Sequence, residues 1–263
     1  MKIPIYQIDA FTAKLFSGNP AAVCLLEDWP DDAALQHIAR ENNLSETAFL
    51  VHRGSAVELR WFTPRTEVAL CGHATLAAAY VLFVCKLWEQ TNIRFLTRSS
   101  GELIVTRRGD RLEMDFPARP AHEIAAPAGL ALALGVTPVQ VLSSEEDLLV
   151  ILLDETTVRQ VSPDFPALEK ISCRGVIISA PGEHCDFVSR FFAPRVGVNE
   201  DPVTGSAHSV LIPFWADKLQ KKDLYALQVS ARGGELFCGY KGERVTIAGH
   251  AVLYLEGTIT IGT

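Results

Sequence analysis

Glu46 stands where a side chain could move a proton. It lies in the segment ENNLSETAFL, residues 41–50, where two asparagines end a predicted helix and an apolar strand follows. A carboxylate beside an apolar run can have a raised pKa, which suits it to take and give a proton near neutral pH. A glutamate near a strand is more often a plain surface residue, so this position alone leaves both interpretations open.

His73 and Cys71 flank Gly72 at the start of a later predicted helix. The imidazole of His73 is either a packed side chain or a second proton carrier, and a helix N-terminus disfavours its charged form. The thiol of Cys71 occupies a position where thiols can be acidified. Thiol racemases use two cysteines, but the counterpart of Cys71 in the internal repeat described below is Thr204. A symmetric two-thiol site is therefore not expected.

A third candidate segment is NEDPVTGSAH, residues 199–208, which enters another predicted helix. Asp201 is either a turn former or a group that orients His73 or the substrate, and Ser206 is either a helix cap or a carboxylate ligand. The first half of the chain shows no comparable acidic turn, so we interpret this turn as a functional insertion. Asn19, in GNPAAV, is either a turn-forming residue or a residue whose side-chain amide faces a ligand-binding cleft.

An internal repeat organises these candidates. RWFTPR at residues 60–65 recurs as RFFAPR at 190–195, a shift of 190 − 60 = 130. Gly72 and Gly205 differ by 133, so the second copy has gained three residues. Further matches at the same shift of 133, such as Gly101-Glu102-Leu103 with Gly234-Glu235-Leu236, indicate a duplicated domain.

The elements that must position these residues form two α+β halves. Strands are predicted at 3–10, 20–26, 47–53, 56–63, 93–98, 101–107 and 111–116, then at 147–153, 175–180, 185–193, 225–231, 234–240, 244–248 and 251–262. Helices are predicted at 31–42, 73–87, 128–134, 164–170 and 205–219. The segment ATLAAAYVLFVC is apolar on every face, which is typical of a helix buried all round. We therefore expect a curved sheet around a central helix, made twice.

The two domains are expected at residues 1–117 and 118–263, joined within the Pro/Ala-rich stretch near 116–129. The two central helices begin at Gly72-His73 and Gly205-Ser206. Free N–H groups and the positive end of the helix dipole attract anions there. If both starts face one cleft between the domains, they would hold a small carboxylate.

Composition excludes several classes of partner. The 263-residue chain carries a net charge of −7 and no long basic run, so neither nucleic acid nor an anionic membrane is expected. The longest apolar stretch, 77–85, is too short to span a bilayer, and the first residues lack a signal-peptide pattern. Six scattered cysteines fit neither a zinc motif nor a disulfide framework. A cytoplasmic protein without metal, nucleotide or flavin is the expectation.

Several segments resemble the phenazine-biosynthesis PhzF-like family. They are IPIYQIDAFT, FSGNPAAVCLL, ENNLSETAFLV, LRWFTPRTEVALCGHATLAAAYVLF, MDFP, SRFFAPRVGVNEDPVTGSAH and VSARGGELFCG, in order over nearly the whole chain. The resemblance implies a diaminopimelate epimerase-like fold, in which two similar domains each curl a β-sheet around a helix and the active site lies between them. It also implies a homodimer and a last strand that can pack back onto the first domain.

The same resemblance suggests roles for residues. Glu46 corresponds to the family's acid/base, and His73, Asp201 and Ser206 match the other residues of its site. Backbone groups of Gly72-His73 and Gly205-Ser206 would form the anion site, with no metal or organic cofactor. The segment around Cys71 differs from that of the phenazine enzyme itself, so the substrate stays open.

Three functional hypotheses follow. The first is a cofactor-independent isomerase that moves a proton on a small carboxylic acid through Glu46 in an interdomain cleft. The second is an epimerase or dehydratase of the wider superfamily that uses Cys71. The third is a non-catalytic protein that binds or senses a small acid with the same anion site.

Overall fold

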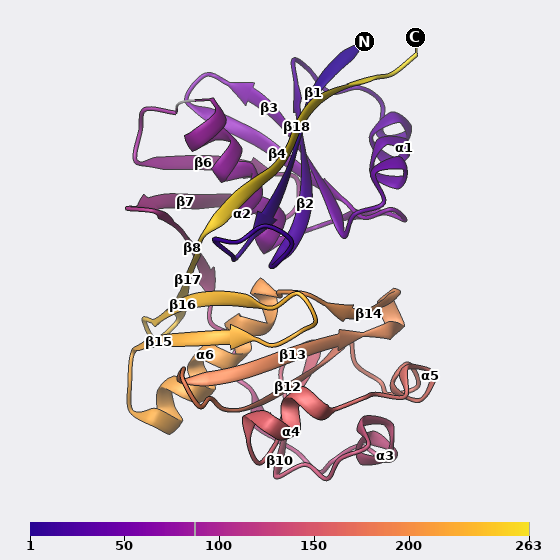
Figure 1. Cartoon of the computed structure of the whole chain (residues 1–263), viewed down its shortest axis with the longest axis vertical. Coiled ribbons are helices and arrows are strands. Elements are labelled where there is room, and N and C mark those ends of the chain that lie inside the picture. Colours follow the sequence, from indigo (N-terminus) through magenta and orange to yellow (C-terminus); the bar gives the residue numbers. More distant parts are fainter. Residues whose placement is uncertain (87, 263) are drawn as a thin grey trace. The chain divides into compact units, whose positions relative to one another are not determined.

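The computed structural model describes residues 1–86 and 88–262. The chain forms two compact units, one made of Met1–Asp115 with Ala248–Thr263 and the other of Phe116–Ile247 (Figure 1). The first division falls two residues before the expected boundary at residue 117. The last strand returns to the first unit. The mixture of strands and helices in each unit confirms the expected α+β class.

The first unit is mostly strands. These are β1 (Lys2–Ala10), β2 (Asn19–Leu26), β3 (Glu46–Arg53), β4 (Ala56–Phe62), β5 (Glu67–Val68), β6 (Asn92–Thr97), β7 (Glu102–Arg108), β8 (Arg111–Pro117) and β18 (Ala251–Thr260). Its helices are α1 (Asp32–Asn42), α2 (Gly72–Tyr80) and the π-helix η1 (Val81–Cys85). The strand order is β18-β1-β2-β3-β4-β6-β7-β8, with β5 hydrogen-bonded to part of β4.

Helix α2 lies against the inner face of this sheet. Its residues from His73 to Ala79 are all buried, as expected for a helix that is apolar all round. The predicted helix 73–87 instead changes to a π-helix after Tyr80, and its residue 87 lies outside the described residues. The outer face packs against α1, where Leu35 and Ile38 join a core that includes Phe49 and Val51 of β3.

Helix α1 ends where the sequence predicts. The carboxylate of Asp31 accepts a hydrogen bond of 2.6 Å from the backbone N–H of Ala34 and caps the helix start. Asn43 caps the end with φ 47°, the left-handed conformation that asparagine tolerates. The chain then enters β3, whose first residue is Glu46. Because side chains alternate along a strand, Glu46 points away from the face of Phe49 and Val51, toward α2.

The two ends of the chain lie side by side. Strand β18 pairs antiparallel with β1 from Lys2, opposite Thr260, to Ala10, opposite Ala251. The N-terminal ammonium donates to the carbonyl of Ile261 at 2.8 Å, and Figure 1 shows the yellow C-terminal strand beside the indigo N-terminal one.

The second unit repeats this design. Its strands are β9 (His122–Glu123), β10 (Gln140–Ser143), β11 (Asp147–Ile151), β12 (Gly175–Pro181), β13 (Phe187–Ala193), β14 (Val198–Asp201), β15 (Asp223–Gln228), β16 (Gly234–Tyr240) and β17 (Arg244–Gly249). Its helices are α3 (Leu130–Leu134), α4 (Glu155–Gln160), α5 (Phe165–Leu168), the 3-10 helix η2 (Pro194–Val196) and α6 (Gly205–Leu219). The buried central helix is α6, and α3, α4 and α5 pack on the other face.

Strand pairing supports the duplication. The series β1-β2-β3-β4-β6-β7 is antiparallel, parallel, antiparallel, parallel and antiparallel. The series β10-β11-β12-β13-β15-β16 repeats the same order of directions. The short strands β5 and β14 occupy matching places on β4 and β13.

The interpretation of the acidic turn as an insertion is wrong. Arg60 of β4 donates to Glu67 of β5 at 2.7 and 2.8 Å, and Arg190 of β13 donates to Glu200 of β14 at 2.8 and 3.0 Å. Glu67 is thus the counterpart of Glu200, at the shift of 133. The added residues lie within 196–199, at the end of η2 and the start of β14, where the first copy has only Thr66. Asp201 replaces Val68 of the first copy.

No helix within the described residues is both long and apolar enough to cross a membrane.

Candidate active site

Glu46 and His73 contact each other in the first unit. Glu46 begins β3 and lies opposite Ala21 of the parallel strand β2, whereas His73 is the second residue of α2. The Oε2 atom of Glu46 is 3.1 Å from Nε2 of His73. The Glu46 side chain is 18% exposed and that of His73 is 5% exposed, so the carboxylate can reach a ligand while the imidazole is held inside.

Asn19 bears on which ring nitrogen of the neutral His73 imidazole carries the proton. Its side-chain nitrogen lies 3.2 Å from Nδ1 of His73. An amide nitrogen only donates, so with the amide oriented this way Nδ1 accepts. The proton of a neutral imidazole is then on Nε2, the ring nitrogen that lies 3.1 Å from the carboxylate of Glu46. Asn19 was predicted to present its amide to a ligand; the structure places the side chain, which is fully buried, against His73.

The thiol of Cys71 is the other neighbour of His73. Its Sγ is 3.5 Å from Nδ1, and the residue is buried. Burial, with a contribution from the negative charge of Glu46, raises the pKa of Cys71 to about 11. The expectation of an acidified thiol at this helix start is therefore not met. The loss of solvation raises the pKa of Cys71 more than the neighbouring imidazole and N–H groups lower it.

Opposing effects act on the imidazole. Burial lowers the pKa of His73, while charge and hydrogen-bond interactions with Cys71 and Glu46 raise it, and the net direction is upward. Because the Cys71 thiol keeps its proton at neutral pH, Glu46 is the partner that favours an additional proton on the ring. Glu46 and His73 together can thus hold and exchange a proton.

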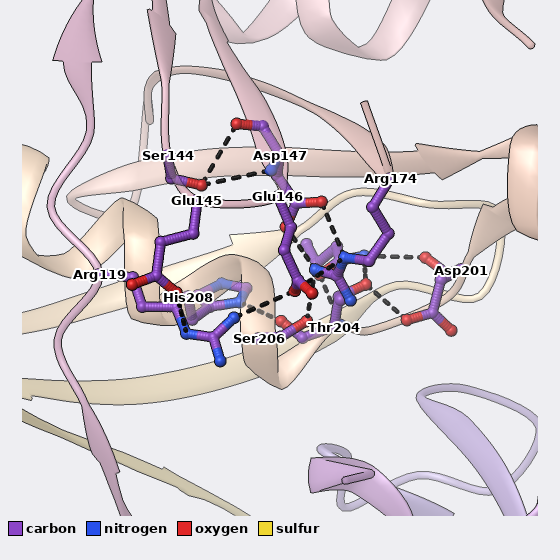
Figure 2. Close-up of polar contacts among 11 residues, drawn as sticks. Arg119, Ser144, Glu145, Glu146, Asp147, Arg174, Asp201, Thr204, Ser206 and His208 are labelled. Atoms are coloured by element: carbon purple, nitrogen blue, oxygen red, sulfur yellow. Dashed lines mark hydrogen bonds and ion pairs between the residues drawn. The ribbon is translucent and has the colours of Figure 1, made fainter. Parts of the chain in front are cut away.

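The second unit holds a separate network around the start of α6 (Figure 2). The hydroxyl of Thr204 donates to the carboxylate of Asp201 at 2.5 Å. Gln228 of β15 accepts from the backbone N–H of Thr204 at 2.8 Å and donates to the carbonyl of Asp201 at 2.8 Å. These bonds fix the turn that enters α6. Gln228 carried no signal in the sequence, because it follows Thr204 by 24 residues.

Ser206 contacts an arginine that sequence reasoning also missed. Arg174 donates from Nη2 to the hydroxyl oxygen of Ser206 at 3.2 Å, and its guanidinium forms a two-point ion pair with Asp147 (Figure 2). Asp147 is buried, whereas the side chain of Arg174 is 31% exposed. Since the oxygen of Ser206 accepts from Arg174, its hydroxyl hydrogen is available for a ligand atom. Ser206 is the second residue of α6, not its cap.

The starts of α2 and α6 share a further feature. Neither Cys71 nor Thr204, the two residues before Gly72 and Gly205, caps its helix with a side-chain hydrogen bond. The first-turn N–H groups are thereby suited to an anion. Whether Asp201, Gly205 and Ser206 serve the same ligand as Glu46 and His73 stays a prediction.

Comparison with known proteins identifies the family. Residues 8–257 match the profile of the phenazine biosynthesis-like protein family, PhzC-PhzF. The chain belongs to this family. It is 54% identical to an uncharacterized isomerase of Pseudomonas aeruginosa, over 99% of this chain and 100% of that one. A crystal structure of a PhzF-family protein from Enterococcus faecalis superposes with a TM-score of 0.97 at 45% identity, covering 99% of this chain and 100% of that chain.

The fold extends further than the family. A hydroxyproline epimerase from Agrobacterium vitis matches with a TM-score of 0.63 over 98% of this PhzF-family chain and 92% of that one, at 11% identity. That likeness concerns the fold alone. It confirms the epimerase-like architecture expected from the sequence.

Proposed function

We propose that this PhzF-family protein is an isomerase that moves a proton on a small carboxylic acid without a cofactor. Family membership and the isomerase relative of Pseudomonas aeruginosa support the reaction class. The observation that carries the proposal is the 3.1 Å contact between Glu46 and His73, which places a partly exposed carboxylate against a buried imidazole.

In this proposal Glu46 acts as the general base and then as the general acid. Its carboxylate removes a proton from a carbon made acidic by the substrate's carboxyl or an adjacent double bond, and the electron pair shifts along the substrate. The same proton, or one from His73, is returned at another carbon, so that no atom is gained or lost. The Nε2–H of His73 stabilises the carboxylate while it is charged.

The substrate's carboxylate requires donors. Backbone groups of Gly72 and His73 are proposed to supply them, and Gly205 and Ser206 are proposed to contribute the same way, with the Ser206 hydroxyl hydrogen left free by Arg174. Asp201 is proposed as a further positioning group. Replacing Ser206 by alanine should raise KM more than it lowers kcat if Ser206 binds the carboxylate.

The test is hydrogen exchange followed by NMR in D₂O with a panel of small cyclic and amino carboxylic acids. Wild type should incorporate deuterium into at least one acid, and Glu46→Gln should reduce this by about 100-fold or more, the usual contribution of a general acid/base. Glu41→Gln is the matched control, because Glu41 is exposed and lies in the same segment. Equal exchange by wild type and Glu46→Gln would exclude Glu46 as the proton carrier. Binding without exchange by wild type would favour a small-acid sensor.

A Cys71-based epimerase or dehydratase is the second candidate, and the 3.5 Å contact between its Sγ and His73 favours it. The raised pKa of Cys71 opposes it, because little thiolate forms at neutral pH. Modification by a thiol reagent that substrate prevents, together with loss of exchange in Cys71→Ser, would support this mechanism.

We also propose that the protein acts in the cytoplasm as a homodimer. Light scattering coupled to gel filtration measures the dimer, and cell fractionation tests the location.

A further inference from the structure

Three different metal-ligating side chains converge at the start of α2. A carboxylate oxygen of Glu46, Sγ of Cys71 and a ring nitrogen of His73 lie within 4.8 Å of one another. Across residues 1–86 and 88–262, no other three His, Cys, Asp or Glu side chains meet this criterion. Carboxylate, thiolate and imidazole are the ligands that Zn²⁺ takes in proteins.

The spacing is close to that of a metal site. Zinc bonds of about 2.0–2.3 Å in a tetrahedron place neighbouring ligand atoms roughly 3.3–3.8 Å apart. The distance from Sγ of Cys71 to Nδ1 of His73 is 3.5 Å, and from Oε2 of Glu46 to Nε2 it is 3.1 Å. A single ion uses one ring nitrogen, so the third spacing must close by roughly 1 Å. If the ion takes Nε2, which Glu46 already contacts, Cys71 must supply this by rotating its side chain.

The surroundings also suit a bound cation. His73 is held by the buried helix α2, Cys71 is the residue before that helix, and Asn19 contacts Nδ1 of His73, the ring nitrogen away from Glu46. If the ion takes Nε2, the amide of Asn19 can turn its oxygen toward Nδ1–H, the type of outer contact that metal-bound histidines usually have. Three protein ligands leave a fourth position for water, as in open zinc sites.

We propose that Glu46, Cys71 and His73 bind Zn²⁺ or a similar thiophilic divalent cation, and that the bound ion inhibits the enzyme. On binding, the S–H bond of Cys71 breaks, its proton leaves to solvent, and the thiolate forms a bond with the metal. One thiolate and one carboxylate then balance the two positive charges. The inhibition rests on the proposed function, because the ion occupies both groups that are to move the proton.

The binding experiment needs no substrate. Chelator-treated full-length protein is titrated with Zn²⁺ in a calorimeter and with Co²⁺ in a spectrophotometer, where a sulfur-to-cobalt charge-transfer band reports a thiolate ligand. Wild type should bind one ion. Cys71→Ser should abolish the band and weaken binding by at least about tenfold, since even outer contacts of a metal are worth that much. Glu46→Gln should weaken binding while keeping the band.

Cys173→Ser is the control, because Cys173 is half-buried and lies in the other unit. It should bind Zn²⁺ like wild type. The proposal is overturned if wild type binds no ion, or if Cys71→Ser binds as tightly as Cys173→Ser while circular dichroism shows all variants folded.

The inhibition arm uses the deuterium exchange assay with and without Zn²⁺, and EDTA should restore activity. The two proposals can fail separately. If zinc binds through Cys71 while wild type and Glu46→Gln exchange deuterium equally, the metal site is supported and the proposed mechanism is excluded. Loss of exchange in Glu46→Gln without any zinc binding does the reverse.

Discussion

Glu46 and His73 contact each other at 3.1 Å although 27 residues separate them, and the histidine is held from its other side by Asn19 at 3.2 Å. The contact arises because β3 pairs parallel with β2 beside the start of α2. Glu46 and Asn19 thereby come from the first residues of neighbouring strands. The Nδ1 atom of His73 thus meets a strand residue, Asn19, as well as the thiol of Cys71 at 3.5 Å.

Replacing Asn19 should change the protonation of His73. In Asn19→Asp, the new carboxylate would attract a proton to Nδ1 and remove the preference for Nε2–H, whereas Asn19→Ala would leave Nδ1 without its amide donor. We expect the ¹⁵N chemical shifts of the His73 ring to move and exchange to fall by about tenfold or more. Asn199→Ala, at an exposed position of β14, is the control and should alter neither. Unchanged ring shifts in both Asn19 variants would refute this role.

The ion pair of Arg174 with Asp147 should contribute to stability. Removing the guanidinium leaves Asp147, which is 3% exposed, as a buried carboxylate without its ion-pair partner. Breaking a buried pair costs about 3–5 kcal/mol, and because Arg174 is itself nearly one-third exposed we expect about 2 kcal/mol for Arg174→Gln. Guanidinium unfolding measures this.

Arg119→Gln is the matched control, since Arg119 pairs with the exposed carboxylates of Glu145 and Glu146 (Figure 2). Its loss should cost less than about 0.5 kcal/mol. Equal destabilisation by the two variants would show that the buried Arg174–Asp147 pair contributes no more to the free energy of unfolding than the exposed pairs of Arg119.

His208 should make folding sensitive to mild acid. Burial lowers its pKa to about 4, from the ordinary value of 6.5. The folded protein therefore binds this proton less readily than the unfolded chain. The contribution of neutral His208 to the free energy of unfolding is fully present above pH 6.5. It is lost as the pH decreases toward 4, by about 3 kcal/mol at most. Unfolding curves measured from about pH 7.5 to about pH 4.5 determine this loss.

In His208→Gln this part of the pH dependence should disappear. Glutamine can still donate to the carbonyl of Thr204, which His208 contacts through Nδ1 at 2.8 Å. A pH profile identical to that of wild type would assign the acid sensitivity to other groups.

Gly18, the residue before Asn19, should tolerate no side chain. Its φ is +66°, and a Cβ atom there would lie 2.1 Å from the carbonyl oxygen of Ala10. Gly54 has φ +64° with open space around it, so Gly54→Ala should cost only the conformational penalty of about 1 kcal/mol. Gly18→Ala should cost at least about 2 kcal/mol more and disturb the Asn19 contact. Similar unfolding free energies for the two variants would contradict the steric argument.

Much of the fold could be predicted from the sequence. The long strands and the helices α1 and α6 fall within about three residues of their predicted bounds, because alternation, apolar periodicity and caps such as Asn43 are local signals. Strands β5, β9, β10 and β14 and helix α4 carried no such signal. They are two to six residues long and depend on partners elsewhere, as β14 depends on the Arg190–Glu200 ion pair.

The candidate site divides in the same way. By itself the sequence established the internal duplication, the buried character of both central helices, and the candidates Glu46, Cys71 and His73. Only the tertiary structure decided that Asn19 contacts His73, that burial keeps the Cys71 thiol protonated, and that Arg174 reaches Ser206. The physical reason is that residue type and local pattern specify what a side chain can do. Strand pairing and burial decide which groups it meets and which protons it keeps.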